Sequence, residues 1–372
     1  MTLFGSASSE GTERYRRRFD GKISQEHFRT WQGLAVSSIG IGTYLGNHDA
    51  DTDQQYHDAV VAAVESGCNV IDTAINYRYQ RSERSIGTAL KELAARGFAR
   101  EEIVVATKGG FIPFDGAPPK DIRSYFNDTF VKPGIAQFSD VIAGCHCMTP
   151  RYLLNQLDCS LRNLDLDCVE IYYLHNPETQ LGKIPREEFN ERVLRAFEAL
   201  ESAVSSGKIR MYGTATWDGY RKDPAAQDYL SLSQIVELAI KAGGKNHHFK
   251  AIQLPLNLGM TEALALTNQQ VEAKPFSILG AAQALDVAVM CSASVLQGQL
   301  TRNLPSIISD TFQGLESDGQ RAIQFVRSAP GVTTALVGMK TIEHVRENLR
   351  AAKIKPTPWE QYSKLFQASE ST

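Results

Sequence analysis

Four ionisable side chains in the first half of the chain have the types and spacing that carbonyl reduction requires. Asp72, Lys108 and His175 each directly follow a short apolar run, and Tyr77 lies five residues after Asp72. A phenol has a reference pKa near ~10 and is a poor proton donor at neutral pH unless a cation lowers that pKa. We expect Asp72 to hold Lys108, and Lys108 to lower the pKa of Tyr77. Tyr77 would then protonate a carbonyl oxygen that His175 holds by a hydrogen bond, as hydride reaches the carbon.

Each of these residues, taken singly, also has an ordinary structural explanation. Asp72 could cap a turn, Lys108 could lie on the surface, and His175 could be a loop histidine with its hydrogen bonds satisfied. The case for a shared site depends on the strand ends being neighbours. If they are, the four groups converge, and a lysine buried there without a partner would be costly.

The segments that must position these side chains form a repeated pattern from about residue 34. Apolar runs predict strands at 35–39 (continuing into 40–44), 69–72, 103–107, 168–174, 209–214, 250–254, 287–291 and 333–337. Helical periodicity predicts helices at 53–67, 82–96, 150–164, 187–206, 231–242, 276–285, 318–328 and 341–352. Doubly apolar strands that alternate with amphipathic helices indicate a parallel sheet covered by helices, and eight repeats favour closure into a (β/α)8 TIM barrel. The chemistry of such barrels lies at the carboxyl ends of the strands.

The glycines after the first apolar run argue against the other common α/β fold, the doubly wound dinucleotide-binding sheet. That fold usually carries G-x-G-x-x-G after its first strand, with a helix directly behind it. Gly40, Gly42 and Gly46 have one extra residue in the second gap, and no helix is expected immediately afterwards. We therefore predict one barrel domain over residues 34–372.

Three stretches fall outside the repeat. Residues 1–33 are expected to form an N-terminal extension and barrel-floor segment, the polar, arginine-rich part of which could instead be a partner-binding tail. A C-terminal tail is expected from about residue 353. The segment 109–149 is rich in proline, glycine and aromatic residues and is too long for a simple connection, so we expect a lid over the active site.

Composition excludes several other classes of function. The chain has 372 residues and a formal net charge of −3, which argues against a nucleic-acid partner. It contains no apolar run of about 18 residues and no apolar core of a signal peptide near its start, so we expect no membrane span and a cytoplasmic location. The six cysteines are scattered and are interpreted as reduced core residues. Cys145-His146-Cys147 resembles part of a metal site, but no second ligand pair follows at suitable spacing, and no metal is predicted.

Several short motifs occur in the order in which they are found in one known family. They are Gly42-Thr43-Tyr44, Ile71-Asp72-Thr73-Ala74 with Tyr77, Ala106-Thr107-Lys108, Ile171 to Pro177, Ala251-Ile252-Gln253, Val337 to Lys340, and Glu347-Asn348-Leu349. Over roughly residues 34–352 the chain thereby resembles the aldo-keto reductases. The resemblance implies a (β/α)8 barrel, NADP(H) as cofactor, and a catalytic tetrad of Asp72, Tyr77, Lys108 and His175.

The cofactor assignment also has a physical basis in the segment after the last predicted strand. Lys340 lies at the start of a predicted helix, where backbone N–H groups favour a phosphate but a lysine is unfavourable without an anionic partner. Lys340 could meet the 2′-phosphate of NADP, although it could also be an ordinary helix-start lysine. By resemblance Gln253 would bind the nicotinamide amide. The implied cofactor contacts are Gly42, Thr43, Tyr44, Asp72, Gln253, Ser292, Gly298, Leu300, Gly338, Lys340, His344, Glu347 and Asn348.

Four positions depart from the pattern of that family. Ala215 and Thr216 stand where a Ser-Asn pair usually holds the nicotinamide amide, and Cys291 stands where an aromatic ring usually stacks. His344 occupies a position often held by arginine, which weakens a phosphate clamp at neutral pH. The departures leave the tetrad intact but affect the expected affinity for the cofactor.

Two functions from different classes follow. The first is NADPH-dependent reduction of a small-molecule aldehyde or ketone; the second is an NADP(H)-binding regulatory or interaction subunit with weak redox activity. A third class, a metal- or carboxylate-dependent barrel hydrolase or lyase, is disfavoured, because the chain has no clustered set of ligands at its predicted strand ends. Tyr44 and Trp217 are candidate apolar walls for the substrate, while its identity and the oligomeric state do not follow from the sequence.

Overall fold

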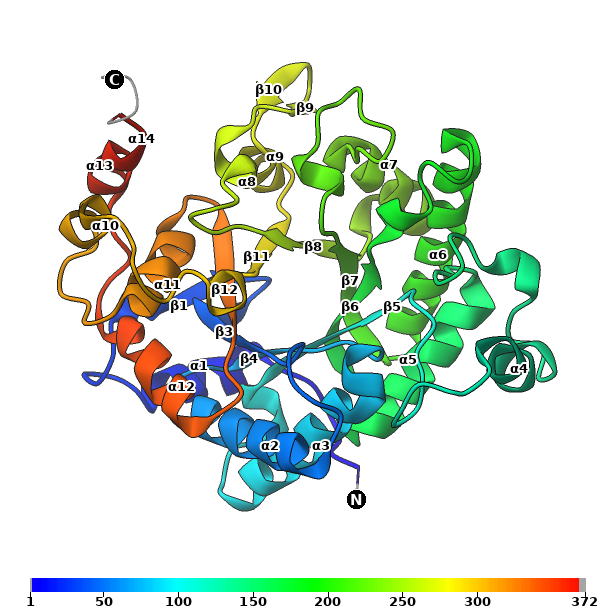
Figure 1. Ribbon diagram of the computed structural model, residues 1–372, viewed down its shortest axis with the longest axis horizontal. Helices are drawn as coiled ribbons and strands as arrows, with labels where there is room; N and C mark the ends of the chain where they lie inside the picture. Colours follow the sequence, from blue (N-terminus) through cyan, green and yellow to red (C-terminus); the bar gives the residue numbers. More distant parts are fainter. Residues whose placement is uncertain (1, 368–372) are drawn as a thin grey trace.

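Eight parallel strands close into a barrel in the computed structural model, which describes residues 2–367 (Figure 1). Around the barrel they are β3 (Ile39–Gly42), β4 (Val70–Asp72), β5 (Val104–Gly109), β6 (Val169–His175), β7 (Ile209–Ala215), β8 (Phe249–Pro255), β11 (Ala288–Ser292) and β12 (Val332–Gly338). The last strand pairs in parallel with the first, Gly338 opposite Gly42. This arrangement confirms the predicted (β/α)8 TIM barrel.

Helices surround the strands. The eight that follow the barrel strands are α2 (Ala50–Glu65), α3 (Arg81–Ala95), α5 (Pro150–Leu164), α6 (Arg186–Ser205), α7 (Leu232–Gly243), α9 (Ile278–Ala284), α11 (Asp318–Ser328) and α12 (Ile342–Asn348). Two of them, α5 and α11, have the predicted bounds. The predicted helix 341–352 is divided, because α12 tightens into a 3-10 turn at Leu349–Lys353. Thr149 is the N-cap residue of α5, but its side chain makes no capping hydrogen bond.

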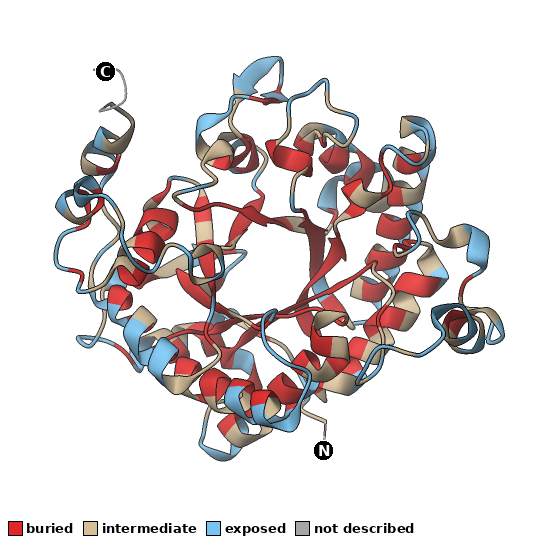
Figure 2. Ribbon diagram, viewed as in Figure 1, coloured by how far each residue is buried: buried red, intermediate tan, exposed pale blue. Residues whose placement is uncertain are grey.

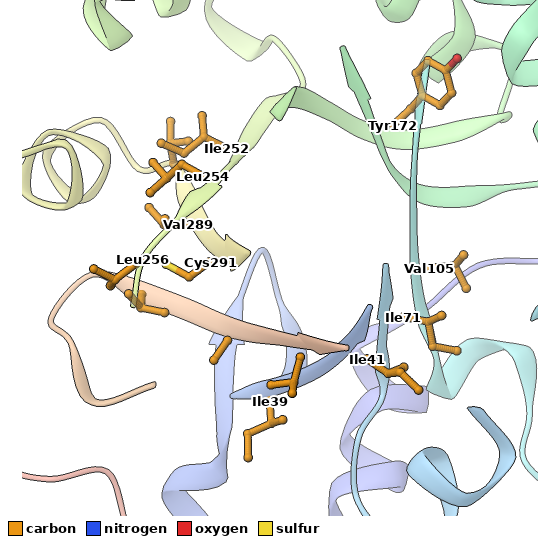
Figure 3. Packing of buried hydrophobic residues seen from close by; sticks show 14 of the residues in the cluster. Ile39, Ile41, Ile71, Val105, Tyr172, Ile252, Leu254, Leu256, Val289 and Cys291 are labelled. Carbon is orange, nitrogen blue, oxygen red and sulfur yellow. The ribbon is translucent and has the colours of Figure 1, made fainter. Parts of the chain in front are cut away.

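Side chains alternate between two apolar layers along each strand. Val70, Val104 and Ile171 belong to the cluster inside the barrel, whereas Ile71 and Val105 pack between the strands and the helices. Figure 2 shows buried residues along the strands and on the inward faces of the helices, and Figure 3 shows the outer layer. Each of Asp72, Lys108 and His175 comes two positions after a residue of the inner cluster. Strand alternation therefore turns these three side chains toward the inside of the barrel.

The predicted first strand, 35–39, is divided between two sheets. Its first part belongs to β2 (Leu34–Ser37), which forms an antiparallel hairpin with β1 (Phe28–Trp31), and only its last residue enters the barrel strand β3. Asn69, just before β4, binds this hairpin through its side chain, donating to Ala35 O at 2.9 Å. The hairpin therefore lies at the end of the barrel where the strands begin. The helix α1 (Ser9–Arg17) precedes this hairpin in the chain, and its Tyr15 is completely buried.

The long 109–149 insertion follows β5, the third barrel strand, as expected. Its helix α4 (Ile122–Phe126) continues into a π-turn (Asn127–Val131), and Phe126 and Phe130 pack with Tyr152 of α5. Figure 1 shows α4 outside the ring of helices, away from the barrel centre. The aromatic residues thus bind the insertion to α5, so this part lies beside the barrel mouth and does not form the lid that we expected.

Further short helices and strands lie in the remaining connections and in the C-terminal segment. They are α8 (Glu262–Ala265), β9 (Gln269–Val271), β10 (Lys274–Phe276), α10 (Ser306–Thr311), α13 (Trp359–Tyr362) and α14 (Lys364–Gln367). In the predicted C-terminal tail, Tyr362 stacks on Phe325 of α11 with 5.3 Å between ring centres. Residue 1 of the extension and residues 368–372 of the tail lie outside the described residues. Within 2–367, no helix combines the length and apolarity needed to cross a membrane.

Candidate active site

A buried ion pair joins the ends of β4 and β5. Lys108 Nζ lies 2.7 Å from Asp72 Oδ2 and also donates to the backbone oxygen of Thr73 at 2.7 Å. The Lys108 side chain is completely buried. Burial acts to lower the pKa of Lys108, but the Asp72 carboxylate and Tyr77 outweigh it and raise that pKa above its usual range. The lysine is therefore a buried ammonium, as the sequence predicted, and it is not a surface residue.

Tyr77 begins the 3-10 turn Tyr77–Gln80 in the loop after β4. Lys108 Nζ lies 4.8 Å from the centre of its ring. Burial raises the pKa of Tyr77, and the opposing effect of Lys108 does not offset it. The expected lowering of the phenol pKa is thus only one contribution to a net rise, and the phenol is protonated at neutral pH. That is the form a proton donor needs.

The backbone beyond Tyr77 is strained. Arg78, Tyr79 and Gln80 have φ of 48°, 57° and 70°, a left-handed conformation that side chains other than glycine seldom adopt. The Arg78 guanidinium holds this segment by donating to Asn47 O at 2.6 Å and to Asp53 Oδ1 at 2.6 Å. These long-range bonds set the position of Tyr77, and no local sequence signal predicts them.

His175 ends β6 and faces Tyr77, with 5.9 Å between the ring centres. Burial lowers its pKa well below the usual range, and Lys108 and His146 lower it further. The imidazole is therefore neutral and can donate a hydrogen bond to an oxygen. All four predicted tetrad residues thus come together at one end of the barrel.

Two residues that the sequence analysis did not assign to the site contact His175. The ring of Phe111 lies 5.0 Å from that of His175, at 88°, and His146 Nε2 lies 2.7 Å from the His175 carbonyl oxygen. His146 was considered only as a metal ligand. The described residues contain no group of three or more histidine, cysteine, aspartate or glutamate side chains suited to a metal ion. The sequence offered one signal for His146: it is a polar residue between two cysteines, shortly before a helix, which is typical of a buried side chain with a specific hydrogen-bond partner.

Most of the predicted cofactor contacts lie on one arc of the barrel rim, formed by the neighbouring strands β11, β12 and β3. Ser292, Gly338 and Gly42 end these three strands. The rest of the set lies in the segments that follow: Thr43, Tyr44, Gly298, Leu300, Lys340, His344, Glu347 and Asn348. Asp72 and Gln253 belong to the tetrad network, in which Gln253 Nε2 donates to Asp72 Oδ1 at 2.7 Å.

The rim residues suit a phosphate-bearing ligand. Gly338 is exposed, and a Cβ added to it would meet no atom within 4 Å. Lys340 makes no ion pair with any residue of the described range, although much of the surface charge elsewhere is paired. The Gly298 backbone has φ of 89°, which favours glycine. The arc therefore offers open backbone and an unpaired cation.

The positions that depart from the family pattern have separate explanations. Thr216 N donates to Gln253 O at 2.8 Å, and Ala215 is buried inside the barrel. Cys291 is completely buried in the outer layer, next to Leu254 on β8 (Figure 3). It therefore does not replace the stacking aromatic ring, because strand alternation turns its side chain away from the barrel mouth.

Comparisons with known proteins agree with this architecture. The Aldo/keto reductase family model matches residues 38–238, more than half of the chain. A "Putative voltage-gated potassium channel subunit beta" from Schizosaccharomyces pombe is 25% identical over 88% of each chain. The "NADH-specific methylglyoxal reductase" of Escherichia coli is 30% identical over 50% of each chain. The crystal structure of an aldo/keto reductase from Klebsiella pneumoniae with NADP and acetate has a TM-score of 0.61 at 22% identity, covering 92% of this chain and 95% of that one. The chain belongs to the aldo/keto reductase family.

Proposed function

We propose that the protein reduces an aldehyde or ketone to an alcohol, reversibly, with NADP(H) as cofactor and Tyr77 as general acid. The observation that carries this proposal is the buried Asp72–Lys108 pair beside the Tyr77 ring, with the neutral His175 imidazole also next to that ring. A structural ion pair alone would not need a phenol and an imidazole at the same barrel end. Metal-free carbonyl reduction uses all four groups.

The rim residues support NADP(H) as the cofactor. The unpaired Lys340 would hold the 2′-phosphate, the open backbone at Gly338 and Gly298 would accept the pyrophosphate, and Glu347 and Asn348 would hold the adenine. The Klebsiella structure contains NADP, and another S. pombe relative is named "Aldo-keto reductase yakc [NADP(+)]". When bound, NADPH would supply the hydride.

The four side chains of the tetrad have different roles in the proton transfer and in binding the carbonyl oxygen. Tyr77 donates its phenolic proton to the carbonyl oxygen, and the Lys108 ammonium stabilises the phenolate that is left. Asp72 keeps that ammonium in place and offsets its charge. His175 donates a hydrogen bond to the same oxygen, which orients the substrate and stabilises the negative charge that develops there.

Exposed aromatic side chains near the site support an apolar or ring-shaped substrate. The ring of Tyr44, 58% exposed, lies 5.0 Å from that of Tyr77, and Trp217, which follows β7, is 44% exposed. Phe111 borders His175. Aromatic rings of this kind bind flat apolar groups well.

To test this proposal, the purified protein is mixed with NADPH and a panel of aromatic and aliphatic aldehydes, and the consumption of NADPH is measured. Tyr77→Phe should lower kcat by roughly 10²- to 10⁴-fold, the usual size of a general-acid contribution. NADPH binding, measured by fluorescence, should be unchanged. Tyr229→Phe is the control, because it removes a phenolic hydroxyl that donates to the backbone oxygen of Asn268 and lies outside the tetrad. A fully active Tyr77→Phe enzyme would show that Tyr77 is not the acid.

The second candidate function is an NADP(H)-binding regulatory or interaction subunit. The S. pombe relative named as a channel subunit favours it, as do the changed positions Ala215 and Thr216. This candidate predicts that the chain binds NADPH but consumes none with any aldehyde of the panel.

A further inference from the structure

No residue of the range 2–367 anchors the His175 imidazole by a hydrogen bond. Its Nδ1 is buried and has no partner among the described residues. Only ring packing and the main chain at the end of β6 orient the side chain. The residue directly after it, Asn176, has a left-handed φ of 45°, so the strand ends abruptly at the catalytic position. The position of His175 therefore depends on what holds its backbone.

His146 holds that backbone with one defined tautomer. Its Nε2 lies 2.7 Å from His175 O, and a carbonyl oxygen can only accept, so Nε2 carries the proton. Burial lowers the pKa of His146 to about 4, so the ring is neutral at physiological pH and Nδ1 is bare. The amide of Gln180 donates to that Nδ1 at 3.0 Å. Both nitrogens of His146 are thus used to fix the segment that begins at His175.

The backbone around His146 is arranged to make room for this hydrogen bond. A Cβ on Gly110 would lie 2.7 Å from His146 Nε2 and 3.0 Å from His175 O, so only glycine fits beside the bond. Gly110 O accepts from Cys147 N at 2.8 Å, which ties the two ends of the 109–149 insertion together. Phe111 forms a bridge with His146, and its ring packs on both histidines.

We propose that His146 is a positioning residue for the catalytic His175, and that the two ends of the 109–149 insertion exist to support it. His146 touches neither the reacting atoms nor the cofactor arc, and it acts through the His175 carbonyl. This inference rests on the proposed function, in which His175 binds the substrate oxygen. It gives the insertion a role that its peripheral helix α4 does not explain.

Three variants separate this role from general stability. His146→Ala removes the donor to His175 O. His146→Gln places an amide N–H at about the reach of Nε2 and should restore the hydrogen bond. Gly110→Ala places a methyl group too close to both the donor and the acceptor without changing His146. Lys132→Ala, at an exposed position of the same insertion, is the control.

Steady-state kinetics and binding are measured on each variant. In His146→Ala and Gly110→Ala, kcat should fall roughly 10- to 100-fold, the size expected when a catalytic group is displaced by about 1 Å. The dissociation constant for NADPH should be unchanged, because the cofactor arc lies on other strands. His146→Gln should recover most of kcat, and Lys132→Ala should match the wild type. Equal kcat in His146→Ala and the wild type would overturn the proposal.

A spectroscopic readout works even if the wild type proves inactive. Histidine ring NMR signals are recorded with ¹³C-labelled histidine, and the His175 signal is assigned by its loss in His175→Asn. That signal should shift or broaden in His146→Ala and Gly110→Ala, and stay in place in His146→Gln and Lys132→Ala. An unchanged His175 signal in folded His146→Ala would overturn the positioning role. Absence of turnover with these NMR changes present would contradict the proposed function alone.

Discussion

The side-chain amide of Gln253 donates a 2.7 Å hydrogen bond to Asp72 Oδ1, and the two residues come from strands that lie on opposite sides of the barrel, β8 and β4. Lys108 binds the other oxygen of the same carboxylate. Asp72 therefore connects a neighbouring strand and the opposite strand at once. A carboxylate whose oxygens are both occupied can remain charged although it is almost completely buried.

Gln253→Leu should destabilise the fold by roughly 1–3 kcal/mol, because it leaves Asp72 Oδ1 buried without a donor. Urea unfolding followed by circular dichroism measures the change. Gln270→Leu, at an exposed position of β9, makes the same replacement where no buried acceptor is involved and should leave the stability unchanged. Equal effects of the two substitutions would contradict a structural role for the Gln253–Asp72 bond.

Lys108→Met should abolish turnover and lower the free energy of unfolding by about 3–5 kcal/mol, because Asp72 is left as a buried charge without its counterion. Adding Asp72→Asn to that variant removes the charge and should recover part of the loss. The double-mutant cycle over Lys108 and Asp72 gives their coupling directly. Effects that add to within about 0.5 kcal/mol would show that the pair does not act as a unit.

Glu178 should make the stability of the protein fall as the pH rises. It follows His175 by three residues, and its Oε1 accepts from Trp217 N at 2.8 Å while its buried Oε2 has no partner among the described residues. Burial raises its pKa from 4.5 to about 7, against the opposing effect of the Trp217 N–H. Because the folded state holds this proton more tightly than the unfolded state, the stabilisation is complete below pH 4.5 and is lost as the pH rises through about 7.

Glu178→Gln isolates this effect, since the amide oxygen still accepts from Trp217 N but does not titrate. Relative to this variant, the wild type should lose roughly 3 kcal/mol of unfolding free energy between acidic and mildly alkaline pH. Urea unfolding of both proteins across that range measures the difference. Buried histidines such as His27 titrate in both proteins, so their contributions to the unfolding free energy cancel in the difference. Parallel pH profiles would mean that Glu178 ionises normally in the folded state.

Lys340→Ala should weaken NADPH binding roughly tenfold, the usual effect of losing one charged hydrogen bond, and weaken NADH binding much less. Only NADPH carries the 2′-phosphate that we assign to Lys340. Fluorescence titration with both cofactors provides the measurement, and Lys241→Ala, exposed on α7, is the control. The E. coli relative is named as NADH-specific, so the wild-type ratio must be measured as well. Equal losses for the two cofactors would remove Lys340 from the phosphate site.

Much of the fold follows from local signals. Helix α5 has the predicted bounds because Pro150 suits the first helical turn, and the strands are recognisable because both of their faces are apolar. The division of 35–39 into β2 and β3 was missed, since both halves are equally apolar and only the choice of hydrogen-bond partner separates them. The path of the 109–149 insertion could not be predicted, and α4 does not form the expected lid, because its aromatic residues suit packing on α5 as well as they would suit a lid.

The residues alone settled which groups stand at the strand ends, because a parallel barrel brings every carboxyl end to the same face. That is why Asp72, Tyr77, Lys108 and His175 were found without the structure. Three features required the folded chain: Gln253 binding Asp72 across 181 residues of sequence, His146 bound to the His175 carbonyl oxygen, and Cys291 turned into the outer layer. Each depends on a contact between segments far apart in the chain or on the strand register, and the local pattern of residues does not specify which groups such a contact joins.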